Sequence, residues 1–328
     1  MFTTHFTQRL EVGLKAMLKK WNMPDSAEVS LLNVSENATF QAYDLNTDRR
    51  LILRVHRPGY HKAVEIQSEL AWILALREQD VVDTPAPVPT TSGGILTSIK
   101  EGNANWHVAA FEFMPGDEPN VGEHLVDWFK KLGAITAKLH QHAKQWQHPS
   151  WFTRKTWNTE TMIGAKGFWG DWRQAINLQP AGQQIIANAV KVIENRLKVY
   201  GQGPERYGLV HADLRLANLL VDNERLGIID FDDCGFCWFA YDFAAAISFH
   251  ETDPSITALQ IAWIEGYRQV ANFSQDDVDE LPTFIMLRRI LLTAWLSTHF
   301  ETPTGQELGP TYTDGTVSLA EKFSAQHG

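Results

Sequence analysis

A short polar segment in the second half of the chain carries three side chains that could act together on phosphate. Asp213 and Asn218 lie five residues apart, and Asp230 follows after two apolar runs separated by the polar turn 222–225. This pattern predicts a β-hairpin, which would return the chain to its starting level and bring Asn218 close to Asp230. We expect Asn218 and Asp230 to bind Mg²⁺ beside the carboxylate of Asp213, because hard cations prefer oxygen ligands. The chemistry indicated is metal-assisted phosphoryl transfer.

The spacing of these residues resembles the catalytic core of the protein-kinase-like fold. The segment reads His-x-Asp-x-x-x-x-Asn from His211 and continues to Ile-Asp-Phe at 229–231. With Ala212 after the histidine, and Tyr-Asp-Phe-Ala at 241–244, it is more similar to the aminoglycoside phosphotransferase and homoserine/choline kinase superfamily than to ordinary protein kinases. The resemblance implies an α+β, bilobal fold, with an N-terminal lobe of antiparallel sheet and helix and a larger, mainly helical C-terminal lobe. It also implies an ATP- and Mg²⁺-dependent enzyme with Asp213 as the catalytic base.

The first third of the chain predicts the elements of the N-terminal lobe. We expect a helix within 1–22, two strands across 29–43, a strand at 51–56, a helix at about 62–78, and strands near 94–98 and 105–113. The turn between the first two strands lacks the glycine-rich motif of protein kinases. In the resembled fold this turn would cover the nucleotide, and Ser35 and Asn37 could then meet phosphate.

Arg54 stands where the resembled family has a lysine that holds nucleotide phosphates. A guanidinium can also clamp phosphate oxygens and is always charged. We expect Glu69, at the edge of the apolar stripe of the helix at 62–78, to pair with Arg54; Glu65, one turn earlier, is the second candidate. The alternatives are an arginine in water on an edge strand and a pseudokinase that binds nucleotide without turnover.

A Pro-Gly pair at 115–116 ends the last strand of the predicted lobe and indicates a hinge. Backbone groups near Glu112 could read the edge of the adenine, and Phe113 and Met114 would line an apolar base pocket. The sequence therefore predicts a nucleotide-binding lobe at 1–113 and a catalytic and substrate-binding lobe at 114–328.

The second lobe is predicted to be helical outside the catalytic segment. We expect helices at about 121–142, 180–200, 255–272 and 277–300, a return to helix at 243–249, and a short last helix from 317 after a polar tail. Residues 146–172 show no clear period. His140 is expected to be a structural, hydrogen-bonded histidine, and the resemblance implies that Asp242 tethers the catalytic loop.

Composition limits the partners of the protein. The net charge of -10 argues against nucleic acid or an anionic membrane as the main partner. The N-terminus shows no signal peptide, and the apolar stretch 281–296 is too short to span a bilayer. Two cysteines, Cys234 and Cys237, favour a reducing cytoplasm, and we expect two buried or half-buried thiols rather than a redox pair or a metal site.

The phosphoryl acceptor remains open at this stage. A small hydroxyl compound, such as an amino alcohol, an amino acid or an aminoglycoside, is the first expectation, because no room is left for an activation loop. A protein kinase similar to the bacterial stress-response kinase is the second, and the pseudokinase is the third. Asp232 and Asp233 could face the acceptor, bind a second ion or be solvated. The sequence leaves the oligomeric state open.

Overall fold

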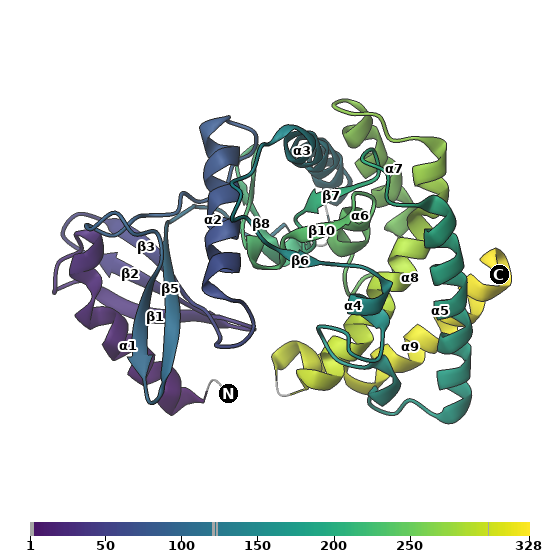
Figure 1. Cartoon of the computed structure of the whole chain (residues 1–328), viewed down its shortest axis with the longest axis horizontal. Helices are drawn as coiled ribbons and strands as arrows, with labels where there is room; N and C mark the ends of the chain where they lie inside the picture. Colours follow the sequence, from purple (N-terminus) through teal and green to yellow (C-terminus); the bar gives the residue numbers. More distant parts are fainter. Residues whose placement is uncertain (1–2, 120–121, 123, 301) are drawn as a thin grey trace. The chain divides into compact units, whose positions relative to one another are not determined.

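The computed structural model describes residues 3–119, 122, 124–300 and 302–328, and the chain forms two compact units (Figure 1). Unit 1 comprises residues 1–116, 147–154 and 227–232. Unit 2 comprises residues 117–146, 155–226 and 233–328. The lobe boundary between 113 and 114 remains a prediction, while the predicted α+β architecture with an antiparallel sheet is confirmed.

Unit 1 contains a five-stranded sheet, with the strands in the order β1-β2-β3-β5-β4 and every neighbouring pair antiparallel. Its elements are α1 (Thr4–Ala16), η1 (Leu18–Trp21), β1 (Glu28–Val34), β2 (Ala38–Asp44), β3 (Arg49–Val55), α2 (Ala63–Glu78), β4 (Thr97–Glu101) and β5 (Ala104–Glu112). The predicted first helix is confirmed, although a 3-10 turn replaces its last residues.

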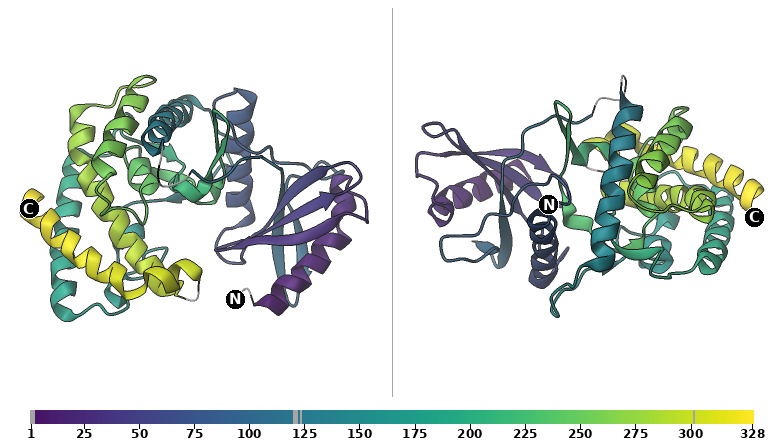
Figure 2. Two further views of the ribbon diagram at one scale, coloured as in Figure 1. Left: turned by 180° about the vertical axis from the view of Figure 1, so that it is seen from behind. Right: turned by 90° about the horizontal axis from the view of Figure 1, so that it is seen from above.

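Side-chain alternation along β3 separates the core of unit 1 from a polar face. Leu51, Leu53 and Val55 are fully buried in the cluster that also contains Leu10 of α1. Successive side chains of a strand point to opposite faces, so Arg54 points away from that cluster. Figures 1 and 2 show α1 and α2 on opposite sides of the sheet. Arg54 is directed toward α2, where it donates to Glu69.

Unit 2 is mainly helical and also holds three short strands in one sheet, in the order β6-β10-β7. Its helices are α3 (Leu125–Gln145), α4 (Thr159–Ile163), α5 (Pro180–Tyr200), α6 (Tyr241–Ala246), α7 (Ile256–Arg268), α8 (Gln275–Thr298) and α9 (Pro303–His327). The strands of this sheet are β6 (Lys155–Thr156), β7 (Tyr207–Val210) and β10 (Gly235–Trp238). The predicted hairpin consists of β8 (Leu219–Asp222) and β9 (Arg225–Ile228).

Two glycines let α3 and α7 pack with their backbones in close approach. A Cβ added to Gly133 would lie 2.0 Å from the carbonyl oxygen of Trp263, and one added to Gly266 would lie 1.8 Å from that of Lys130. No side chain fits at either position. This packing fixes α3 next to the strand β7, with which it also makes contacts and which leads into the catalytic segment.

Two boundaries predicted from the sequence differ from those in the structure. The strand expected at 94–98 begins only at Thr97, because residues 91–95 form a turn. The prediction of an irregular polar tail is wrong. Helix α9 begins at Pro303, capped by Thr302, and its residues Thr313 and Thr316 are buried against the rest of unit 2. The predicted start of a helix at Val121 lies outside the described residues. None of the helices in the described ranges is long and apolar enough to cross a membrane.

Candidate active site

The carboxylate of Asp213 is held from three directions within unit 2. Its Oδ1 accepts a hydrogen bond of 2.6 Å from Nη2 of Arg288. Its Oδ2 accepts from Nδ2 of Asn218 at 2.8 Å and from Nε of Arg215 at 3.3 Å. Burial acts to raise the pKa of Asp213, but the charges of Arg288 and Arg215 outweigh it and lower that pKa below its usual value. Asp213 is therefore ionised at neutral pH.

Asn218, the first predicted metal ligand, is buried and has one side-chain atom left for a cation. Its Nδ2 donates to the backbone oxygen of Asp213 at 2.8 Å and also to Oδ2 of the same residue. Both partners are acceptors, which fixes the orientation of the amide. Among the described residues Oδ1 of Asn218 accepts no hydrogen bond, so a carbonyl oxygen, a ligand that suits Mg²⁺, is available.

The loop that carries Asp213 is tethered by Asp242 of α6. The Oδ1 of Asp242 accepts from the backbone N–H of Ala212 at 2.8 Å, and Oδ2 accepts from that of His211 at 3.3 Å. Ala212 has φ of 68°, a left-handed conformation that is strained for alanine, and the hydrogen bond from its N–H holds it there. The tethering role expected for Asp242 is confirmed.

The same carboxylate also fixes His140 of α3. Nε2 of His140 lies 3.0 Å from Oδ2 of Asp242, and Nδ1 lies 2.9 Å from the hydroxyl of Tyr267. Burial lowers the pKa of His140 despite the nearby carboxylate. The histidine is a structural group, as the sequence predicted, and it links α3 and α7 to the loop.

Arg54 of unit 1 is buried and pairs with Glu69 of α2. Its Nη2 lies 2.5 Å from Oε1 of Glu69, which is fully buried. Glu65, the second candidate, instead accepts from the backbone N–H of Lys62 at 2.7 Å and caps α2. The predicted pairing of Arg54 with Glu69 is confirmed, and the edge-strand alternative is wrong. A role of this pair in nucleotide binding remains a prediction.

Asp230, the second predicted metal ligand, lies in the unit-1 segment 227–232. Nη1 of Arg54 donates to its Oδ1 at 3.1 Å, and its side chain is 41% exposed. Asp230 has φ of 62°, a second strained, non-glycine position next to predicted chemistry. Asn218 and Asp230 belong to different units. Their joint binding of one cation remains a prediction.

Burial would lower the pKa of Arg54, but the nearby charges of Glu69, Asp232 and Asp230 outweigh it and raise that pKa above its usual value. Three of the five N–H groups of the guanidinium are used, since Nε also lies 3.4 Å from Nε2 of His56. Counting the hydrogen bonds to the described residues, two N–H groups of Arg54 therefore remain for a ligand.

Two buried histidines that the sequence reasoning did not single out surround Asp232. Nδ1 of His56 lies 3.4 Å from its Oδ1, and Nε2 of His61 lies 3.3 Å from its Oδ2. Burial, aided by the charge of Arg54, lowers the pKa of His56 to about 4. Burial would raise the pKa of Asp232, but His61, His56 and Arg54 lower it well below its usual value. Asp232 is a buried anion that anchors its segment, not a solvated turn acid.

A further arginine ties the same segment to α2. Arg154 donates from Nη1 to the backbone oxygen of Glu65 at 2.8 Å and from Nη2 to that of Asp232. The N–H of Thr153 donates to Oγ of Ser68 at 2.9 Å. Residues 147–154, in a stretch without a readable period, thus help to position the segment that carries Asp230.

The residues expected around the nucleotide all lie in unit 1. Ser35 is half-buried in the turn between β1 and β2, while Oδ1 of Asn37 accepts from the backbone N–H of Arg57 at 3.2 Å and so holds the end of β3. Glu112 ends β5 and pairs with Leu51 of β3, and Phe113 is 37% exposed. Met114 follows as a half-buried residue outside regular structure. Nucleotide contact of these residues remains a prediction.

Cys234 and Cys237 are buried and form no disulfide with each other, and burial raises the pKa of Cys237 well above its usual value. Asp233 belongs to unit 2, where its backbone oxygen accepts from Nε1 of Trp157 at 2.8 Å and its Oδ1 lies 3.9 Å from Nζ of Lys155. Asp233 therefore anchors β6 and is not a solvated turn acid.

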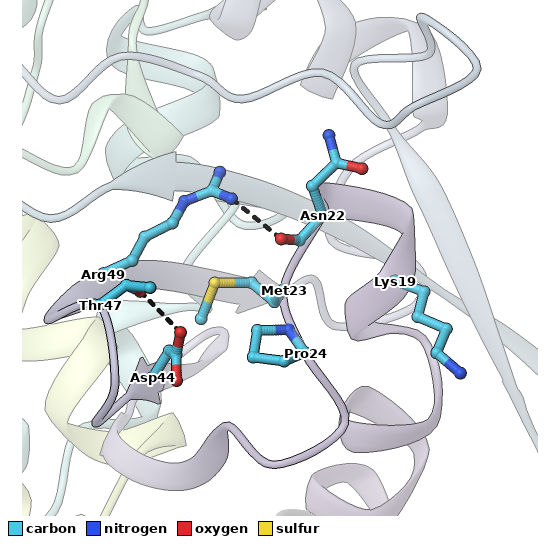
Figure 3. A pocket seen from close by; sticks show the side chains of 7 residues that line it. All are labelled: Lys19, Asn22, Met23, Pro24, Asp44, Thr47 and Arg49. Carbon is cyan, nitrogen blue, oxygen red and sulfur yellow. Dashed lines mark hydrogen bonds between the residues drawn. The ribbon is translucent and has the colours of Figure 1, made fainter.

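A hollow of about 790 Å³ on unit 1 is lined by Lys19, Asn22, Met23, Pro24, Asp44, Thr47 and Arg49. Figure 3 shows these side chains. Lys19, Asp44, Thr47 and Arg49 are engaged in local structure. Arg49 donates to the backbone oxygens of Trp21 and Asn22, and Thr47 donates to Asp44 at 2.6 Å. The hollow contains none of the predicted site residues.

Comparison with known proteins identifies the family. The sequence model of the phosphotransferase enzyme family matches residues 30–273. The chain belongs to this family. A solved microcompartment-associated aminopropanol kinase is 39% identical to it, with a TM-score of 0.88, over 96% of this chain and 98% of the other. The predicted superfamily and the prediction of a phosphotransferase are thereby confirmed.

Two further relatives are more distant. The amicoumacin kinase of Bacillus subtilis (strain 168) is 21% identical over 293 residues, which cover 85% of this chain and 83% of the relative. A solved amicoumacin kinase, in complex with AMP-PNP, Ca²⁺ and Ami, is 21% identical with a TM-score of 0.77, over 99% of this chain and 94% of the other. This structure shares the fold.

Sequence reasoning missed Arg288, which contacts Asp213. In the sequence, Arg288 and Arg289 interrupt the apolar stretch 281–296. Both arginines are buried, at 1% and 4% exposure. Two charges within an apolar helix need partners, and that signal could have led to Asp213 and to Glu251, the partner of Arg289.

Proposed function

We propose that the protein is an ATP- and Mg²⁺-dependent kinase that transfers the γ-phosphoryl group to the hydroxyl of a small amino alcohol. The observation that carries the reaction type is the ionised carboxylate of Asp213, held by Asn218 and Arg288 and tethered through Asp242. The acceptor class is supported by the 39% identity to the aminopropanol kinase.

In this reaction Asp213 orients the acceptor hydroxyl and takes its proton. The acceptor oxygen forms a bond to the γ-phosphorus, while the bond from that phosphorus to the bridging oxygen breaks and its electron pair leaves with ADP. The lowered pKa of Asp213 keeps the base ionised before the step. Its proton is released to solvent when the product leaves.

Asn218 and Asp230 would hold the cation, since each offers an oxygen ligand. When bound, Mg²⁺ neutralises charge on the β- and γ-phosphate oxygens. Arg54, oriented by Glu69, would steady the phosphates with its two remaining N–H groups. Ser35 and Asn37 would cover them, and Glu112, Phe113 and Met114 would border the adenine.

Nucleotide binding is tested first by thermal stabilisation. A ligand of the folded state stabilises by RT ln(1 + [L]/Kd), so ATP with Mg²⁺ should stabilise the protein more than ATP with a chelator does. An absent shift at millimolar nucleotide would contradict the proposal.

The acceptor is tested with a panel of hydroxyl compounds under saturating ATP and Mg²⁺. ADP release and ³¹P NMR of the product are measured for aminopropanol, ethanolamine, choline, threonine, an aminoglycoside and a generic protein substrate. We expect aminopropanol to have the highest kcat/KM, with the phosphoryl group on its hydroxyl. Phosphorylation of the protein substrate and of none of the small compounds would favour the stress-response type of kinase instead. Nucleotide binding without phosphorylation of any acceptor would favour a pseudokinase. Cys234 and Cys237 are buried and form no disulfide with each other, which supports action in the cytoplasm.

A further inference from the structure

Arg288 lies in the middle of α8, buried at 1% exposure within an apolar stretch. A guanidinium loses much of its hydration there, so its partners must compensate. Its one carboxylate partner among the described residues is Asp213, at 2.6 Å. The next residue, Arg289, is also buried but pairs with Glu251 at 2.7 Å and not with Asp213. The two neighbouring arginines therefore pair with different carboxylates.

The guanidinium of Arg288 is itself fixed by three further hydrogen bonds. Nε donates to Oγ of Ser248 at 2.9 Å, and Nη1 donates to the hydroxyl of Tyr241 at 3.0 Å and to the backbone oxygen of Ala212 at 3.3 Å. The planar guanidinium therefore cannot rotate, and its Nη2 sets the position of Oδ1 of Asp213. Arg288 thus links α8 and α6 to Ala212 and Asp213 of the catalytic loop.

A count of lone pairs distinguishes the two oxygens of Asp213. Each carboxylate oxygen accepts about two hydrogen bonds. Oδ2 already accepts from Asn218 and from Arg215, whereas, among the residues that the structure describes, Oδ1 accepts only from Arg288. Oδ1 therefore has the acceptor position that is still open.

We propose that Arg288 is a positioning residue that directs the open lone pair of Oδ1 of Asp213 to the acceptor hydroxyl. This inference rests on the proposed function, in which Asp213 is the base. Lysine at position 288 would keep the charge, but a single ammonium cannot bond Asp213, Tyr241 and Ser248 in the planar geometry of a guanidinium. The expected defect lies in kcat and not in the binding of nucleotide.

The test compares Arg288→Lys with Arg289→Lys, two buried, ion-paired arginines on one helix. We expect Arg288→Lys to lower kcat about 100-fold, the loss expected from a misplaced catalytic group, with acceptor KM and nucleotide affinity within about threefold of wild type. Arg289→Lys should keep kcat within about threefold at a comparable loss of thermal stability. Equal kcat losses in the two variants would show a structural role only and overturn the proposal.

A double-mutant cycle with Asp213→Asn separates this inference from the proposed function. If Arg288 acts through Asp213, Arg288→Lys should cost nothing further once Asp213 is changed, so the two losses are not additive. Additive losses would overturn the positioning role while leaving Asp213 as the base. Full activity of Asp213→Asn alone would instead overturn the proposed function.

If Arg288→Lys does not fold, Tyr241→Phe provides the same test. It removes one anchor of the guanidinium and leaves the charge in place. We expect a smaller kcat loss with unchanged nucleotide affinity, and again no further loss in the Asp213→Asn background. Unchanged kcat in Tyr241→Phe would overturn the proposal.

Discussion

Replacing Glu69 by glutamine tests the buried pair that orients Arg54. Removing one partner of a buried ion pair costs about 3–5 kcal/mol, because the other charge is left uncompensated. Glutamine keeps an oxygen for Nη2 of Arg54, and Asp230 still lies 3.1 Å from Nη1. We therefore expect a smaller loss of stability in unit 1, of about 2–3 kcal/mol.

Glu65→Gln is the matched control, one helical turn away on α2. Its side chain accepts a hydrogen bond from the N–H of Lys62, and glutamine can replace glutamate in such a cap. We expect a change below about 0.5 kcal/mol.

Native-state hydrogen exchange of the α2 amides measures both variants, because it reports the opening free energy of this helix alone. Equal effects of the two substitutions would refute the reasoning, and so would an effect of Glu69→Gln below about 0.5 kcal/mol. The affinity for ATP should fall only in Glu69→Gln, since only that variant leaves Arg54 without its orienting charge.

Two further predictions concern packing and pH. Gly133→Ala places a Cβ 2.0 Å from the carbonyl oxygen of Trp263 and should lower the free energy of unfolding by about 1–3 kcal/mol in urea titrations, whereas Gly203→Ala meets nothing within 4 Å and should change little. His56 has a pKa of about 4 in the folded protein against 6.5 normally, so the stability that it contributes is present above pH 6.5 and is lost as the pH falls toward 4. His56→Gln should remove up to about 3 kcal/mol of the change in unfolding free energy between pH 6.5 and pH 4. An unchanged pH dependence of the free energy of unfolding would contradict this prediction.

The sequence predicted those parts of the site that rest on local pattern. The hairpin after Asn218 follows from two apolar runs around a polar turn, and the pairing of Arg54 with Glu69 follows from a strand and a helical stripe combined with the family resemblance. The tether by Asp242 likewise needed only the motif.

The rest depends on long-range packing that periodicity does not encode. Arg288 reaches Asp213 across 75 residues of chain, and Arg154 reaches Asp232 across 78. Residues 303–316 appeared irregular because they are polar and contain glycine. They form two helical stretches joined by a kink at Gly309, which has φ of 37°. The second stretch is held in the core of unit 2, where Arg289 donates to the backbone oxygen of Tyr312 and to Oγ1 of Thr316.

The most direct test of the account is the rate of phosphoryl transfer from ATP to aminopropanol in Asp213→Asn. Asparagine keeps the size of the side chain but cannot accept the proton, so we expect kcat to fall by about 100-fold or more while the affinity for ATP with Mg²⁺ stays within about threefold. A variant that binds nucleotide and transfers the phosphoryl group at the wild-type rate would contradict the assignment of Asp213 as the base.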